Sequence, residues 1–183
     1  LNKFKAADAL GFAVAAGLLR ELGPVLAALL FASSAGGAMT SEIGLMKTTE
    51  QLDAIDVMAV NPVARVVAPR FWAGVISMPF LAAIFNVCGI FGAYFIGVKH
   101  LGLDGGIFWS QMQSNIEWSY DVLNGIIKSV VFGIAVTLIA VYNGFSSRAT
   151  PEGILRATTQ TVVASALAIL GLDFVLTAFM FTE

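Results

Sequence analysis

The chain has 183 residues, of which 58% are hydrophobic and only 12% are charged, and its mean hydropathy is +0.86. A composition this apolar exceeds what a soluble domain can bury, so the sequence predicts an integral membrane protein. The formal net charge of −2 at pH 7 gives no support to a nucleic-acid partner, and the single cysteine excludes an internal disulfide.

Signatures of common enzyme chemistry are missing from the sequence. It contains no phosphate-binding G-x-x-x-x-G-K-[ST], no H-E-x-x-H and no C-x-x-C, and His100 is its one histidine. A serine hydrolase would need a G-x-S-x-G nucleophile beside a base, and that motif is absent as well. We therefore expect no enzyme activity, no metal site and no cofactor in this chain, which leaves transport or channel function.

The first apolar region, residues 7–39, is interrupted near its middle by a charged, proline-containing stretch, residues 20–24. Its halves are each too short for a membrane span, so the region predicts one long helix that is broken or kinked where Pro24 removes a backbone donor.

The rest of the chain contains longer apolar segments. A helix needs ~20 apolar residues to cross a hydrocarbon layer ~30 Å thick. Three such spans are predicted at residues 70–98, 122–143 and 158–181.

A polar island, residues 40–69, separates the first two spans. Its apolar residues recur at spacings of three and four, which predicts one amphipathic helix within residues 42–60. The residues of this apolar stripe are Leu45, Thr48, Leu52, Ile55 and Ala59.

The opposite face of this predicted helix carries charges but also Met46, Val57 and Met58. A helix that is only solvated has no reason to display such apolar side chains, so the pattern indicates a face that docks against a partner. The alternative is a helix that lies on the membrane surface. The candidate docking residues are Glu42, Met46, Lys47, Glu50, Asp53 and Asp56.

Basic residues are unevenly distributed among the connections between spans. The polar island and the linker 144–157 each carry arginines, whereas the connection 99–121 has Lys99 and no arginine. Because connections rich in lysine and arginine stay in the cytoplasm, the first two are predicted to be cytoplasmic. Residues 99–121 then lie on the opposite side of the membrane.

Two charges lie inside the later spans. Lys128 and Asp173 come at similar depths in neighbouring antiparallel spans, so we expect them to form an ion pair. An isolated charge at such a depth costs ~2.5–3.5 kcal/mol on insertion scales, and pairing offsets part of this cost. The alternative is that each side chain reaches polar surroundings separately. A proton-coupled secondary transporter or channel would instead use Glu21 and Asp173 as titrating groups, and a non-transporting scaffold would use them only for packing.

Small residues recur at every fourth position as Ala28, Ala32 and Gly36, a spacing that lets helices approach closely. Packing within one subunit is a simpler explanation of this ridge than a dimer seam. So few spans do not enclose a transport cavity by themselves, however, and we therefore expect a homodimer.

Long runs of the sequence identify a protein family more specifically than any short motif does. Residues 20–79, RELGPVLAALLFASSAGGAMTSEIGLMKTTEQLDAIDVMAVNPVARVVAPRFWAGVISMP, resemble the MlaE/YrbE family of ABC-transporter permeases, and the resemblance continues through IKSVVFGIAVTLIAVYNG and LRATTQTVVASALAILGLDFVLTAFMF. It implies an all-α polytopic membrane bundle with a cytoplasmic coupling helix, located in the bacterial inner membrane and acting in phospholipid transport. Family members begin with an elbow helix and a first span, so we expect both to precede Leu1. Ser34 stands where many relatives have arginine, so no role of that arginine carries over.

The resemblance also implies partners. Family permeases are homodimers that bind two copies of an MlaF-like ATPase, which uses ATP and Mg, often together with an MlaB-like STAS protein. They lie beneath an MlaD-like MCE hexamer in the periplasm, so the resemblance implies that residues 99–121 form a periplasmic segment. The polar island would then be the coupling helix that the ATPase holds.

In the family, the motif at residues 20–24 lines a phospholipid cavity between the two permease copies. The resemblance therefore implies that Glu21 lies near the lipid headgroup and Leu22 toward the acyl chains, while Arg20 meets the phosphate or holds Glu21 in place. Gly23 and Pro24 would shape the wall of the cavity.

Overall fold

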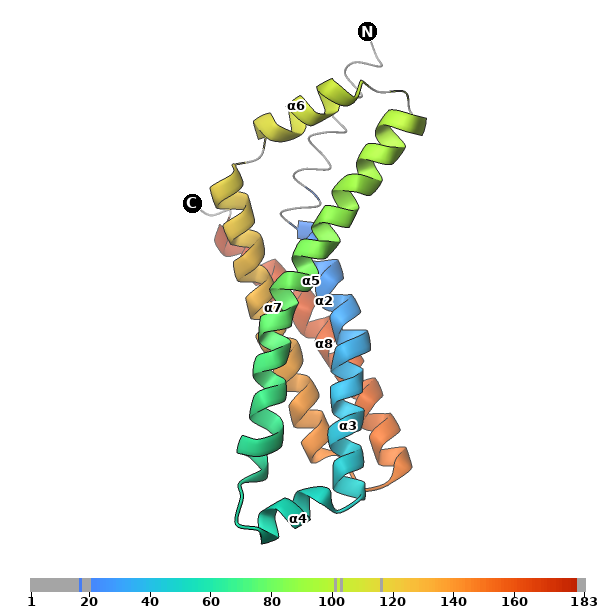
Figure 1. Ribbon diagram of the computed structural model, residues 1–183, viewed down its shortest axis with the longest axis vertical. Coiled ribbons are helices and arrows are strands. Elements are labelled where there is room, and N and C mark those ends of the chain that lie inside the picture. Colours follow the sequence, from blue (N-terminus) through green and yellow to red (C-terminus); the bar gives the residue numbers. More distant parts are fainter. Residues whose placement is uncertain (1–16, 18–20, 101, 103, 116, 181–183) are drawn as a thin grey trace.

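The computed structural model describes residue 17 and residues 21–100, 102, 104–115 and 117–180, and every regular element among them is a helix. Four long helical rods run along the molecule, and two shorter helices, α4 and α6, lie across its opposite ends (Figure 1). The described part of the chain thus forms the all-helical bundle that the sequence predicts.

The first rod consists of three stacked segments, namely α2 (Gly23–Phe31), the π-helical turn η2 (Ala32–Gly36) and α3 (Gly37–Thr48). Pro24 lies in the first turn of α2, and Glu21 and Leu22 before it are π-helical, with Leu22 at φ −66° and ψ −37°. The described part of the interrupted stretch, residues 21–24, is therefore helical, and Arg20 lies outside the described residues. The rod passes the predicted end of the span at residue 39 and continues to the end of α3.

The prediction of a single helix in the polar island is wrong, because the chain turns at Glu50. Its backbone is left-handed, with φ of 59°, and it separates α3 from the short helix α4 (Gln51–Val57). A left-handed residue cannot continue the right-handed hydrogen-bond ladder. The predicted apolar stripe is therefore divided, since Leu52 is buried with Ile43 whereas Leu45 stays exposed.

The second rod begins with the π-helical turn η3 (Val63–Val67), continues through α5 (Ala68–Tyr94) and ends in the π-helical turn η4 (Phe95–His100). The short helix α6 (Gly105–Asn115) follows, and α7 (Trp118–Ser146) and α8 (Pro151–Met180) form the remaining two rods. Within the described residues, four helical stretches are long and apolar enough to cross a membrane, namely Gly23–Thr48, Val63–Lys99, Ser119–Ser146 and Pro151–Met180.

The two arginine-bearing connections lie at the same end of the bundle. Lys47, at the end of α3, donates hydrogen bonds from Nζ to the carbonyl oxygens of Phe145 and Ser147, both at 2.9 Å. The opposite end carries α6 (Figure 1), and its buried Phe108 and Met112 pack against Ile90 and Ala93 of α5. This arrangement agrees with the grouping of connections that the distribution of arginine predicts.

All four rods contribute to one central core. Phe31 of α2, Met78 of α5, Phe132 of α7 and Ile169 of α8 are almost completely buried there. Between membrane helices, close van der Waals packing supplies most of the attraction, because lipid tails are as apolar as these side chains.

Close approach of the rods depends on small residues. A Cβ atom at Gly74 of α5 would collide with the Thr137 side chain of α7. A Cβ atom at Gly144 of α7 would lie 3.0 Å from both the Thr40 carbonyl oxygen and Ile43 Cβ of α3. The predicted ridge of Ala28, Ala32 and Gly36 is likewise buried inside the single chain.

A buried polar cluster joins three of the rods. The hydroxyl of Thr40 in α3 lies 2.8 Å from that of Thr161 in α8 and donates to the Ala140 carbonyl of α7 at 3.0 Å. The Asn143 amide donates to Thr161 Oγ1 at 3.1 Å. Since an unpaired hydroxyl is costly in an apolar interior, these contacts help to specify how α3, α7 and α8 pack.

Candidate functional site

One face of the first rod is exposed along its length. At its start Leu22 is 53% exposed, whereas the neighbouring Gly23 and Pro24 are buried against the bundle. Exposed residues then recur at helical spacing through α2, η2 and the start of α3. This surface, called the outer stripe below, consists of Leu22, Leu26, Leu30, Ser33, Ser34 and Ala38.

The motif at residues 20–24 is divided by this geometry. Arg20 lies outside the described residues. Glu21 is half-buried and Leu22 is exposed at the start of the outer stripe, whereas Gly23 and Pro24 face inward. Of the described motif residues, Leu22 has the side chain that is most open to a lipid or to a second copy of the chain.

The serines of η2 add little polarity to the outer stripe. The hydroxyl groups of Ser33 and Ser34 both donate to the Leu30 carbonyl oxygen, at 3.0 and 2.7 Å. Both hydroxyl groups therefore have their acceptor within the helix. The surface that these small side chains leave can contact lipid or another helix closely. Single π-helical turns of this kind occur frequently at functional sites.

A second exposed surface surrounds α4 at the end of the bundle. Val57 is 88% exposed and Met58 is 66% exposed. Glu50, Asp53 and Asp56 are exposed as well. Apolar side chains mixed with acidic ones on a short terminal helix form a surface suited to a partner protein.

The other candidate docking residues are engaged inside the chain. Glu42 forms an ion pair with Arg70, with 2.8 Å between Oε1 and Nη2, and the Arg70 guanidinium also lies 3.8 Å from Met46 Sδ. Lys47 caps the end of α7, which the sequence analysis missed. The signal for such a cap is a lysine that can reach the last carbonyls of another helix, and this becomes visible only when α3 and α7 are placed together.

Lys128 and Asp173 meet inside the bundle. Lys128 Nζ lies 3.3 Å from Asp173 Oδ1, and the two side chains are 2% and 23% exposed. The lysine also donates to Thr177 Oγ1 at 2.9 Å, a contact that the sequence analysis did not anticipate. Thr177 follows Asp173 by four residues and so lies on the same face of α8, which is the signal that could have indicated it.

These features define the class of the protein. Within the described residues, four rods of membrane-spanning length enclose a buried ion pair and a hydroxyl cluster, and one rod presents a long exposed stripe. Together they are those of an all-helical, multi-pass membrane protein.

Comparison with known proteins identifies the family. The model of the family described as Permease MlaE matches residues 1–179. The intermembrane phospholipid transport system permease protein MlaE of Haemophilus influenzae is 59% identical over 99% of this chain and 69% of its own length. Probable ABC transporter permease proteins of Rickettsia typhi and Synechocystis are 36% and 33% identical, over 98% and 97% of this chain and 69% and 67% of their own lengths. The chain belongs to the MlaE permease family.

Proposed function

We propose that this chain is the transmembrane permease subunit of an ATP-driven phospholipid transporter of the bacterial inner membrane. The observation that carries the proposal is the 59% identity, over nearly the whole chain, to a protein named for intermembrane phospholipid transport. By this proposal the chain helps to maintain the lipid asymmetry of the outer membrane. ATP and Mg would be used by a separate MlaF-like ATPase.

The proposed lipid site lies between two copies of the chain. The outer stripe supports this assignment because it is an exposed, mostly apolar face with small residues at its centre. Leu22 would contact acyl chains, and Glu21 would lie near the headgroup with Arg20. Gly23 and Pro24 would act from behind, by holding the start of α2 against the bundle.

The proposed contact with the ATPase is the surface around α4. Val57 and Met58 supply exposed apolar area, and Glu50, Asp53 and Asp56 supply charge. Met46, Lys47 and Glu42 would support this surface indirectly, through α7 and Arg70. An MlaB-like STAS protein and an MlaD-like MCE hexamer complete the proposed assembly.

The decisive experiment uses Glu21→Lys in the full-length permease with its ATPase. Reversing the charge at the proposed headgroup position should reduce lipid transfer between donor and acceptor vesicles by at least about tenfold, because a like charge would face the Arg20 side. Co-purification of the ATPase should not change. Glu117→Lys, an exposed charge reversal near the start of α7, is the matched control. Loss of assembly with normal transfer per remaining complex would mean that Glu21 is structural.

A proton-coupled transporter is the main competing function. It would use Glu21 and Asp173 as titrating groups, and Asp173 lies 3.3 Å from Lys128 in the structure. The 59% identity to a permease named for phospholipid transport, together with the relatives named as ABC transporter permeases, favours the ABC-transporter proposal. Lipid flux that follows a pH gradient in vesicles without ATPase would support the competitor. A non-transporting scaffold would bind its partners and give no flux under either condition.

A further inference from the structure

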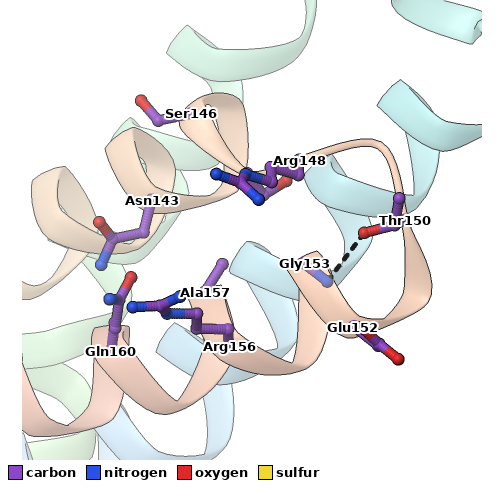
Figure 2. A pocket seen from close by; sticks show the side chains of 10 residues that line it. Asn143, Ser146, Arg148, Thr150, Glu152, Gly153, Arg156, Ala157 and Gln160 are labelled. Carbon is purple, nitrogen blue, oxygen red and sulfur yellow. Dashed lines mark hydrogen bonds between the residues drawn. The ribbon is translucent and has the colours of Figure 1, made fainter.

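A polar cavity of about 440 Å³ lies between the end of α7 and the first turns of α8. Figure 2 shows Arg148 and Arg156 on opposite sides of it, with the amides of Asn143 and Gln160 facing one another nearby. Several side chains that donate hydrogen bonds therefore converge on one hollow at the end of the bundle.

The cavity has a surplus of positive charge. Neither Arg148 nor Arg156 takes part in an ion pair among the described residues, unlike Arg70, whose charge meets Glu42. Glu152 also lines the cavity, but its carboxylate points away from the arginines (Figure 2). Two guanidinium groups on either side of a hollow offer paired hydrogen bonds to an anion such as a phosphate group.

An apolar groove continues from this cavity along α8. The groove, of about 460 Å³, shares Asn143 and Gln160 with the polar cavity, and Val163 and Leu167 line it further along the helix. From Arg156 to Leu167 an α-helix rises ~16 Å, which matches the ~15 Å depth of one leaflet of hydrocarbon. The combined hollow is thus charged at the membrane surface and apolar in the membrane interior.

We propose that the polar cavity and the apolar groove together bind one anionic phospholipid from the leaflet at this end of the bundle. The phosphate would lie between Arg148 and Arg156, and an acyl chain would follow the groove past Val163 to Leu167. Basic pockets between membrane helices bind anionic headgroups in this way. A soluble anion or an acidic segment of a partner protein would use the arginines but would have no use for the groove.

This site is separate from the proposed transport site. It lies where α3 ends and α8 begins, whereas Glu21 precedes the first turn of α2, at the other end of the first rod. The inference therefore does not depend on transport. A Glu21→Lys complex that no longer transfers lipid should still retain the lipid at Arg148 and Arg156, which keeps failure of one proposal distinct from failure of the other.

The test is lipid retention by the full-length permease in its complex, reconstituted with phosphatidylglycerol and phosphatidylcholine and analysed by native mass spectrometry. The double variant Arg148→Gln/Arg156→Gln should weaken phosphatidylglycerol binding by at least about tenfold, because both charges that hold the headgroup are lost. The variant Arg148→Lys/Arg156→Lys should keep much of the binding, since it keeps the charge. Arg65→Gln, an exposed arginine of η3 at the same end, should not change it.

Further measurements distinguish a bound phospholipid from a soluble phosphate compound and from an acidic protein segment. Glycerol phosphate at millimolar concentration should not displace phosphatidylglycerol, and Leu167→Gln should weaken retention of the lipid. Complete displacement by glycerol phosphate would show a site for soluble phosphate and overturn the proposal. A photoreactive residue at Leu167 should capture phospholipid. If it captures only a protein segment, whether of the ATPase or of this chain, or if the glutamine double variant retains as much lipid as the unaltered chain, the proposal is wrong.

Discussion

Lys128 shows how a single residue can constrain a membrane bundle. Its side chain is 2% exposed, yet its ammonium group has both Asp173 and Thr177 within hydrogen-bond reach. Removing one partner of such a pair leaves an uncompensated charge, whereas removing both is much less costly. The contact therefore stabilises the packing of α7 against α8 only while both charged residues are present.

We predict that Lys128→Met lowers the free energy of unfolding by about 2 to 3 kcal/mol, because Asp173 then loses its counter-charge. The double variant Lys128→Met/Asp173→Leu should recover most of this loss. Unfolding by titration with a denaturing detergent measures both. The exposed Lys99, replaced by Met in the same way, is the control. Equal stability of the single variant and the unaltered protein would show that the ion pair contributes nothing.

At the scale of elements, some glycines mark places where two rods approach so closely that no side chain fits between them. Gly74 of α5 lies against Thr137 of α7, and no room is left there for a Cβ atom. Gly92, on the same helix, has nothing within 4 Å of an added Cβ atom. The two glycines therefore form a matched pair for testing the helix contact.

Gly74→Ala should destabilise the protein by ~1–3 kcal/mol, the usual cost of overpacking, whereas Gly92→Ala should be neutral or slightly stabilising. Thermal unfolding of the detergent-solubilised protein measures the difference. Adding Thr137→Ser, which removes the methyl group that the new Cβ atom meets, should restore part of the stability. An equal effect of both alanine variants would mean that the close contact between α5 and α7 has no energetic role.

The short helix α4 has its own prediction, which concerns binding and not stability. Val57→Asp and Asp53→Lys should each reduce co-purification of the ATPase and its stimulation by lipid, because both residues are exposed on the proposed contact surface. Thermal unfolding of the permease should change little. Glu117→Lys at the opposite end should leave ATPase binding intact. Normal ATPase binding by both α4 variants would place the contact elsewhere.

At the scale of the whole molecule, the bundle leaves the outer stripe uncovered although its other side is packed. A homodimer that joins two outer stripes predicts that cysteine at Ser34 forms a disulfide between copies under mild oxidation, in a chain whose exposed Cys88 is first replaced by Ala. Cysteine at Phe80, which is exposed on α5, should not form one. Gel mobility without reductant reports the result. Crosslinking at Phe80 but not at Ser34 would move the dimer interface to α5.

Much of the architecture follows from the sequence by itself. The membrane class and the number of spans follow from composition and segment length, because ~20 apolar residues are needed to cross a bilayer whatever their neighbours are. The ion pair of Lys128 and Asp173 could also be anticipated. The two residues lie at similar depths in neighbouring antiparallel spans, and an unpaired charge is costly at that depth. The family resemblance rests on long runs of residue order and needs no coordinates.

Only the tertiary structure decided which residues face one another. It divided the polar island at Glu50, whose backbone is left-handed. The spacing of apolar residues in the sequence does not reveal a single left-handed residue. The tertiary structure also engaged Lys47 with the end of α7 and paired the exposed Glu42 with Arg70 of α5, while it left Val57 outward. These partners lie far away in the sequence, so the sequence alone does not reveal them. Helix periodicity specifies a face, whereas the choice between burial and exposure of that face depends on which other helices pack against it.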